Sequence, residues 1–121
     1  MKRYVVLLAY RPEVWEAAAA GNGQEYFDAH HAFERFVDAR GARLHSGALC
    51  EAETATTLGP GRGAERVVTD GPFVELIEQL GGYYDVELPD LDTAIAAGRL
   101  LPAGYTVEIR PVVTIEGYEP A

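Results

Sequence analysis

The sequence has very little cysteine, lysine or tryptophan, and few basic residues of any kind. Cys50 is the only cysteine and Lys2 the only lysine among 121 residues. A disulfide within the chain is therefore excluded, which favours a reducing compartment, and a Schiff base would depend on one terminal lysine. Ten basic residues stand against 19 acidic ones, for a formal net charge of −9. Because phosphate backbones and anionic lipids bind basic surfaces, we expect neither nucleic acid nor membrane as a partner.

Long hydrophobic runs are also missing. The run at residues 5–10 is too short to span a bilayer, and no cleavage site of a secretory signal follows it. We therefore expect a cytoplasmic protein. Hydrophobic residues still make up 48% of the chain, which is enough for a core, and residues 1–121 have the length of a single domain.

The spacing of apolar residues predicts alternating strands and helices. Residues 3–10 are apolar on both faces, which is typical of a strand covered on both sides. A helix is expected over 24–40, capped by Asn22, with Phe33 on its apolar face and His30 at the edge of that face. The other expected elements are a helix at 12–20, a strand at 42–50, a hairpin of strands 54–58 and 64–69 joined by GPGRG, a helix or irregular crossover at 73–80 ended by Gly81-Gly82, a strand at 83–88, a helix at 91–100 capped by Asp90, and a strand at 105–115.

This order of elements predicts an α+β fold. Strand, helix, strand, hairpin, strand, helix and strand make a ferredoxin-like split βαβ subunit with an inserted β-hairpin. Its helices would cover one face of the sheet. Val5 and Leu7 nevertheless point away from the face that Val6 and Leu8 share. Something must cover the second face, and in so small a chain we expect a second copy, which makes the protein a homodimer.

A tight turn is expected at residues 70–73. The dipeptide Asp70-Gly71 predicts a turn with a positive φ at glycine, and Pro72 fixes the next φ. Phe73 is expected to anchor the exit of the turn in apolar surroundings.

Four separated segments follow one another along the chain: DGPF at 70–73, EQLGGYY at 78–84, DLDTA at 90–94 and VEIRPV at 107–112. Together they resemble the YCII-related superfamily, in its DGPF-domain branch. The resemblance implies a dimeric α/β barrel of ferredoxin-like subunits. For function it implies several roles: a regulatory protein beside extracytoplasmic-function sigma factors, a protein of a biosynthetic or degradative pathway, or a lyase of dehydrochlorinase type that works through a histidine and an aspartate.

The resemblance can be carried over to individual residues. The family histidine lies eleven residues before the glycine that ends the helix, which matches His30 and Gly41. The family aspartate lies in an Asp-Pro step, which here reads Leu101-Pro102, so the usual His–Asp pair is incomplete. The branch also has Thr and Lys where this chain has Leu76 and Ile77. That change implies a more apolar pocket wall or a different ligand.

His30 is the candidate proton-transfer residue, since its intrinsic pKa lies near neutrality. It could equally be a core histidine satisfied by one hydrogen bond. Asp70 is the candidate that orients His30 in place of the missing aspartate, although an aspartate in a turn often bonds its own backbone. Glu75 could be a base or belong to the solvated face of a short helix.

The remaining candidates would bind substrate. Tyr83 lies on the strand face away from Tyr84, where it could donate to a developing oxyanion or form part of a polar dimer interface. Arg110 could clamp a substrate carboxylate, or pair with a neighbouring glutamate. Phe33 and Phe73 would supply apolar contacts.

Neither a metal nor a cofactor is expected. The side chains of His30 and His31 point about 100° apart on a helix, which disfavours one shared ion. GPGRG at 59–63 lacks the Lys and Ser/Thr of a phosphate loop, and Cys50 is expected to be a small buried hydrophobe. The sequence thus predicts a cofactor-independent lyase, cyclase or isomerase that acts on a small organic or aromatic substrate through His30. The alternative is a non-catalytic metabolite-binding or regulatory protein, associated with sigma-factor signalling.

Overall fold

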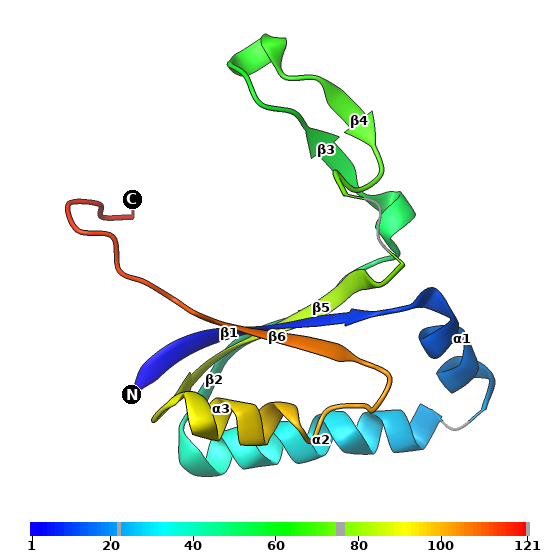
Figure 1. Ribbon diagram of the computed structural model, residues 1–121, viewed down its shortest axis with the longest axis vertical. Coiled ribbons are helices and arrows are strands. Elements are labelled where there is room, and N and C mark those ends of the chain that lie inside the picture. Colours follow the sequence, from blue (N-terminus) through cyan, green and yellow to red (C-terminus); the bar gives the residue numbers. More distant parts are fainter. Residues whose placement is uncertain (22, 75–76, 121) are drawn as a thin grey trace.

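The computed structural model describes residues 1–21, 23–74 and 77–120. Its centre is a four-stranded sheet, to which helices and a separate two-stranded hairpin are attached (Figure 1). The strands are β1 (Lys2–Tyr10), β2 (Ala42–Ala48), β3 (Thr56–Leu58), β4 (Val68–Asp70), β5 (Gln79–Leu88) and β6 (Thr106–Pro111); the helices are α1 (Pro12–Ala20), α2 (Gly23–Arg40) and α3 (Leu91–Gly98), with 3-10 turns η1 (Ala52–Thr54) and η2 (Gly63–Glu65). None of these helices, over the described ranges, is long and apolar enough to cross a membrane.

The strand order of the main sheet is β2-β5-β1-β6. Strand β1 pairs antiparallel with β5 and β6 on its two sides, and β2 pairs antiparallel with β5. This is the ferredoxin-like arrangement, with the β3–β4 hairpin inserted between β2 and β5. The predicted α+β fold class is therefore confirmed, including the inserted hairpin.

The core lies between the sheet and the helices α2 and α3. Alternate side chains of β1 and β5 point to this side, as expected for strands of period two. Phe33 and Val37 of α2 are fully buried against them. Two alanines of α3, Ala94 and Ala97, are almost fully buried, because small side chains let this helix approach the sheet closely. The strand residues that complete the core are Tyr4, Val6 and Leu8 of β1 and Tyr84, Val86 and Leu88 of β5.

The ends of the helices follow the sequence closely. Asp90 caps α3, since its Oδ1 accepts from the amide and hydroxyl of Thr93 at 2.8 and 2.7 Å. Gly41 follows the last residue of α2, and a Cβ there would overlap the carbonyl of Glu87. Glycine thus lets the chain leave α2 close to β5. The predicted cap at Asn22 lies outside the described residues.

Several predicted boundaries are wrong. Gly81-Gly82 lies inside β5 and does not end an element at 73–80. The ring and hydroxyl of Tyr10 occupy the space that a side chain at Gly81 would need. Glycine at this position therefore lets Tyr10 pack against the backbone of β5 and does not end an element. The hairpin strands are shorter than predicted, at residues 56–58 and 68–70. The strand predicted at 42–50 ends at residue 48. The last strand ends at Pro111 and lies at the edge of the sheet, where a residue without an N–H is tolerated.

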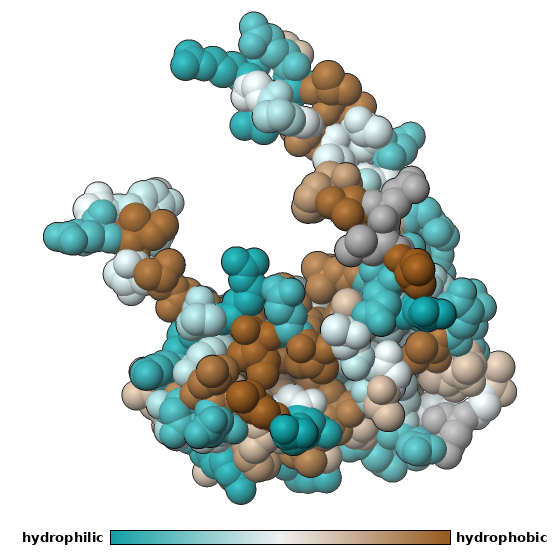
Figure 2. Space-filling model, viewed as in Figure 1, coloured by the Kyte–Doolittle hydropathy of each residue, from teal (hydrophilic) through white to brown (hydrophobic). Residues whose placement is uncertain are grey.

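The second face of the main sheet carries no helix in the described part of the chain. Helices α2 and α3 lie on one side, while the β3–β4 hairpin and the segment after β6 project from the other (Figure 1). Figure 2 shows apolar side chains on both projecting segments, and Val68 of the hairpin and Val113 of the C-terminal segment are 63% and 77% exposed. Val5 and Leu7 of β1 are half-buried on this open face. The expectation that a partner covers the face stays a prediction.

Candidate functional site

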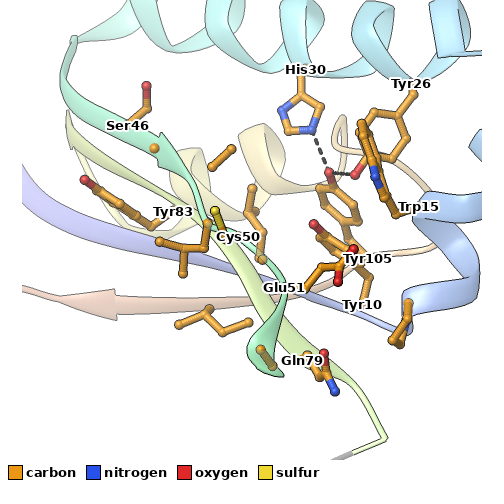
Figure 3. Close-up of a pocket in the computed structure, with 18 of the residues that line it drawn as sticks. Tyr10, Trp15, Tyr26, His30, Ser46, Cys50, Glu51, Gln79, Tyr83 and Tyr105 are labelled. Atoms are coloured by element: carbon orange, nitrogen blue, oxygen red, sulfur yellow. Dashed lines mark hydrogen bonds between the residues drawn. The ribbon is translucent and has the colours of Figure 1, made fainter. Parts of the chain in front are cut away.

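An aromatic pocket opens between α1, the first half of α2 and the segment that follows β2 (Figure 3). Its volume is about 590 Å³, which lies within the roughly 300–1,000 Å³ of small-molecule sites. Tyr10, Trp15, Tyr26, Phe27 and Tyr105 form its aromatic wall. Such a wall presents rigid apolar surface together with a few polar hydroxyls, which suits a small organic ligand.

His30 lies at the inner end of this pocket, on α2. Its Nδ1 is 2.9 Å from the hydroxyl of Tyr84, and its Nε2 is 2.8 Å from the hydroxyl of Tyr105. The side chain is half-buried. Both ring nitrogens therefore have a tyrosine partner, one from β5 and one from the residue that precedes β6.

A carboxylate reaches His30 through one of these tyrosines. The Tyr84 hydroxyl donates to Glu34 Oε2 at 2.8 Å. Glu34 follows His30 by one helical turn, so both side chains lie on the same face of α2. Its other oxygen lies 3.6 Å from Arg43 Nη1. The result is a continuous connection from Glu34 through Tyr84 to His30.

A second connection leads from His30 toward the pocket. The Tyr105 hydroxyl is hydrogen-bonded to that of Tyr26 (Figure 3), and the Tyr105 ring stacks on Tyr10 with centroids 5.0 Å apart. Trp15 meets Tyr26 edge-on at 5.5 Å. Burial raises the pKa of both Tyr26 and Tyr105 above the ordinary tyrosine value. These hydroxyls therefore stay protonated at neutral pH.

Electrostatics keep His30 neutral. Burial lowers the pKa of His30, the nearby Glu34 carboxylate opposes this shift, and the neighbouring His31 adds to it. The imidazole is therefore present as the base at neutral pH, and it is ready to accept a proton.

The pocket wall is acidic. Glu16, Glu51 and Glu53 line it, and none of its described lining residues is Lys or Arg. The pKa of Glu53 is raised because it shares a hydrogen bond with Glu51 and is repelled by that carboxylate. A wall with crowded carboxylates disfavours an anionic ligand and suits a neutral or positively charged one.

Two of the predicted site residues lie on the hairpin side of the molecule. Asp70 ends β4, opposite Thr56, and Gly71 has the predicted positive φ, at 94°. The hydrogen-bond partners of both His30 ring nitrogens are tyrosine hydroxyls and not Asp70. Phe73 is 87% exposed and outside the pocket wall, so the prediction that it sits in apolar surroundings is wrong within one chain. A short turn specifies its own shape and not its place in the fold.

The other predicted residues are scattered. Phe33 is buried in the core, where its ring lies 4.4 Å from that of Tyr84, so it supports the site from behind. Tyr83 lines the outer part of the pocket and points away from His30 (Figure 3). Arg110 lies on the open sheet face, 3.8 Å from Glu108, which is the ion-pair alternative. Glu75 lies outside the described residues.

Cys50 was also predicted wrongly. It is exposed and forms part of the pocket wall, and is not a buried hydrophobe. Because β2 ends at Ala48, the chain turns out of the sheet before it reaches Cys50.

Sequence reasoning missed Glu34, Tyr84 and Tyr105, which are linked to His30, and also the aromatic wall of Tyr10, Trp15, Tyr26 and Phe27. A local signal existed for Glu34, because Tyr26, His30 and Glu34 are spaced four residues apart along one helix face. No local signal existed for Tyr84 and Tyr105, which lie 54 and 75 residues from His30 in sequence. Only the antiparallel packing of β5 and β6 beside β1 brings them under α2.

Comparison with protein families identifies the chain. The sequence pattern of the YCII-related domain matches residues 2–116. The chain belongs to the YCII-related family. A comparison with curated proteins gave no match. Family membership agrees with the ferredoxin-like fold and leaves the ligand to be inferred from the pocket.

In this YCII-related chain, Leu101 stands where the resemblance led us to expect the aspartate of an Asp-Pro step. Leu101 is 6% exposed and belongs to the hydrophobic core. Glu34 is the carboxylate that the structure links to His30 instead, through Tyr84. Among the described residues, no group of three or more His, Cys, Asp or Glu side chains could hold a metal ion.

Proposed function

We propose that this YCII-related protein binds a small organic molecule in the aromatic pocket and that His30 moves a proton to or from it. The observation that carries the proposal is a neutral, half-buried His30 at the inner end of a pocket of about 590 Å³, held by two tyrosine hydroxyls. A histidine whose pKa is lowered by burial is a general base at neutral pH. The matching reaction class is a cofactor-independent lyase, cyclase or isomerase, in which protons move without a redox step.

The wall of the pocket narrows the class of ligand. Tyr10, Trp15 and Tyr26 offer ring faces and edges to an aromatic or apolar body. The same rings attract a cation over their faces, and Glu51 and Glu53 add negative charge. A neutral or positively charged aromatic compound therefore fits better than an aromatic acid.

A binding test can use Trp15, the only tryptophan of the chain, as the reporter. Benzyl alcohol, benzylamine and benzoate are similar in size and differ in charge. We expect the first two to change Trp15 fluorescence, and benzoate to bind about tenfold more weakly, which corresponds to roughly 1.4 kcal/mol of repulsion. Binding of benzoate as tight as that of benzylamine would contradict the charge argument.

A turnover test needs a matched control on the same helix. His31 follows His30 directly and is exposed. Once a substrate has been identified, His30→Ala should lose turnover, whereas His31→Ala should keep it. Unchanged turnover in His30→Ala would remove His30 from the mechanism.

The alternative function is binding without turnover, as a metabolite-binding or regulatory protein associated with sigma-factor signalling. One observation favours it: both ring nitrogens of His30 already bond to tyrosines, so neither faces a ligand directly. In this case the ligand would be recovered unchanged after long incubation, as mass spectrometry can measure. A changed ligand would exclude this alternative.

We also propose that a second copy of the chain covers the open face of the sheet. Leu7 supports this proposal, because it lies mid-strand on that face, opposite Tyr83 and Glu108. The exposed apolar side chains of the hairpin and the C-terminal segment, on the same side, add to it. Sedimentation should give twice the mass of one chain. Leu7→Arg should give a single chain, whereas His31→Arg on the helix side should not; a wild-type monomer would refute the proposal.

A further inference from the structure

The hydrogen bonds around His30 form a chain with a direction. The Tyr84 hydroxyl has one proton, and it donates this proton to Glu34 Oε2. Toward His30 Nδ1, at 2.9 Å, the Tyr84 oxygen can therefore only accept. Nδ1 must then carry a proton. Because a neutral imidazole has only one N–H, the proton is absent from Nε2.

The other side of the ring follows from this assignment. A bare Nε2 accepts, so the Tyr105 hydroxyl donates to it over 2.8 Å. The Tyr105 oxygen is then left to accept from Tyr26, its second hydrogen-bond partner. All the donors thus point one way, from Tyr26 toward His30 on one side and from His30 toward Glu34 on the other.

We infer that Glu34, acting through the Tyr84 hydroxyl, holds neutral His30 with its proton on Nδ1, so that Nε2 exchanges protons with the pocket through Tyr105 and Tyr26. Glu34 and Tyr84 are positioning residues in this arrangement. Tyr26 and Tyr105 line the pocket and form its proton path. The tautomer rests on the hydrogen bonds and on the neutral state of the half-buried ring, whereas the proton path rests on the proposed function.

The proton transfer balances without any further reactant. A bound acid X–H gives its proton to the Tyr26 oxygen, the Tyr26 proton passes to the Tyr105 oxygen, and the Tyr105 proton passes to His30 Nε2. Both tyrosines end as neutral hydroxyls, the ligand as its anion, and His30 as the imidazolium. The imidazolium is then stabilised by Glu34 through Tyr84, because Nδ1–H and the Tyr84 hydroxyl already point toward that carboxylate. The reverse sequence returns the proton to another atom of the ligand.

The tautomer can be measured in the ligand-free protein. Long-range ¹H–¹⁵N spectra of ¹⁵N-histidine-labelled protein, recorded above the titration of His30, distinguish a protonated from a bare ring nitrogen. The chain has three histidines, and His30→Gln identifies the signal. We expect a protonated Nδ1 and a bare Nε2. A protonated Nε2 in the wild type would overturn the inference.

Variants test what holds the tautomer. Tyr84→Phe removes the acceptor of Nδ1–H, so the proton should move to Nε2 and donate to Tyr105. Tyr83→Phe is the matched control, since this neighbour points to the opposite face of β5, and it should leave the pattern unchanged. An unchanged pattern in Tyr84→Phe would refute the role of Tyr84.

Glu34→Gln keeps a carbonyl acceptor for the Tyr84 hydroxyl and removes the charge. The tautomer should therefore stay, while the pKa of His30 falls further, since Glu34 raises it in the wild type. This variant also serves if Tyr84→Phe does not fold. A pKa of His30 that stays unchanged in Glu34→Gln would refute the role of the carboxylate. These spectra need no ligand, so their outcome is independent of the probe-binding and turnover tests of the proposed function.

Discussion

Replacement of His30 by alanine should lower the free energy of unfolding by about 1–3 kcal/mol. The ring makes two hydrogen bonds, of 2.9 and 2.8 Å, in a half-buried site. A neutral hydrogen bond contributes about 0.5–1.5 kcal/mol, and two such bonds give the estimate. The cost goes no higher because Tyr84 keeps Glu34 as a partner and Tyr105 keeps Tyr26, so neither hydroxyl is left buried and unpaired.

The assay is urea unfolding followed by circular dichroism, at one fixed protein concentration because association would make stability depend on it. His31→Ala is the control, and it should lie within about 0.5 kcal/mol of the wild type because His31 is exposed. A change below about 0.5 kcal/mol in His30→Ala as well would refute the reasoning. The two hydrogen bonds would then contribute nothing net, and His30 would be retained for function without benefit to stability.

Three further changes test the same site. Because burial lowers the pKa of His30 in the folded protein, the unfolded chain binds a proton at this residue more readily as pH falls below about 6.5. The contribution of His30 to the free energy of unfolding should therefore be complete above that pH and decrease below it. The urea midpoint of His30→Ala should fall less steeply with decreasing pH than that of the wild type. Gly81→Ala should displace Tyr10 and lower the free energy of unfolding by about 1–3 kcal/mol in the same urea assay. Gly98→Ala is the control: its Cβ would lie 3.6 Å from a β6 side chain, so the free energy of unfolding should stay the same or rise by up to about 1 kcal/mol. Alkylation of Cys50 with N-ethylmaleimide should block the response of Trp15 to benzylamine; an unaltered response would mean that the probe binds elsewhere.

The fold was predictable from the sequence because its signals are local and repeated. The order of strands and helices predicted a ferredoxin-like subunit, and the strand order β2-β5-β1-β6 agrees with it. Asp90 marked the start of α3 by the ordinary chemistry of a helix cap. The prediction failed at Gly81-Gly82, where two glycines suggested the end of an element but lie inside β5. Gly81 makes room for Tyr10, which approaches from β1, and the residues around Gly81 in the sequence give no sign of this long-range contact.

The site was only half predictable for the same reason. Helical spacing placed His30 at the edge of the buried face of α2, and its half-burial agrees. The partner was sought in Asp70 because a carboxylate was expected to pair with the histidine directly. The carboxylate is instead one helical turn away, at Glu34, and it reaches the ring through a tyrosine of β5. An indirect link of this kind requires knowledge of the strand register, which the sequence does not supply.

His30 is therefore linked to a carboxylate, Glu34, although Leu101 stands where we expected an aspartate. Three site residues, spaced four residues apart, lie on one face of α2: Tyr26, His30 and Glu34. Tyr84 of β5 and Tyr105, which directly precedes β6, complete the hydrogen-bonded network. Because Phe33 packs directly on the Tyr84 ring, the distance between α2 and β5 is set by the core. A smaller side chain at Phe33 would let the Tyr84 hydroxyl move relative to His30, so core packing and the protonation state of the site are mechanically linked.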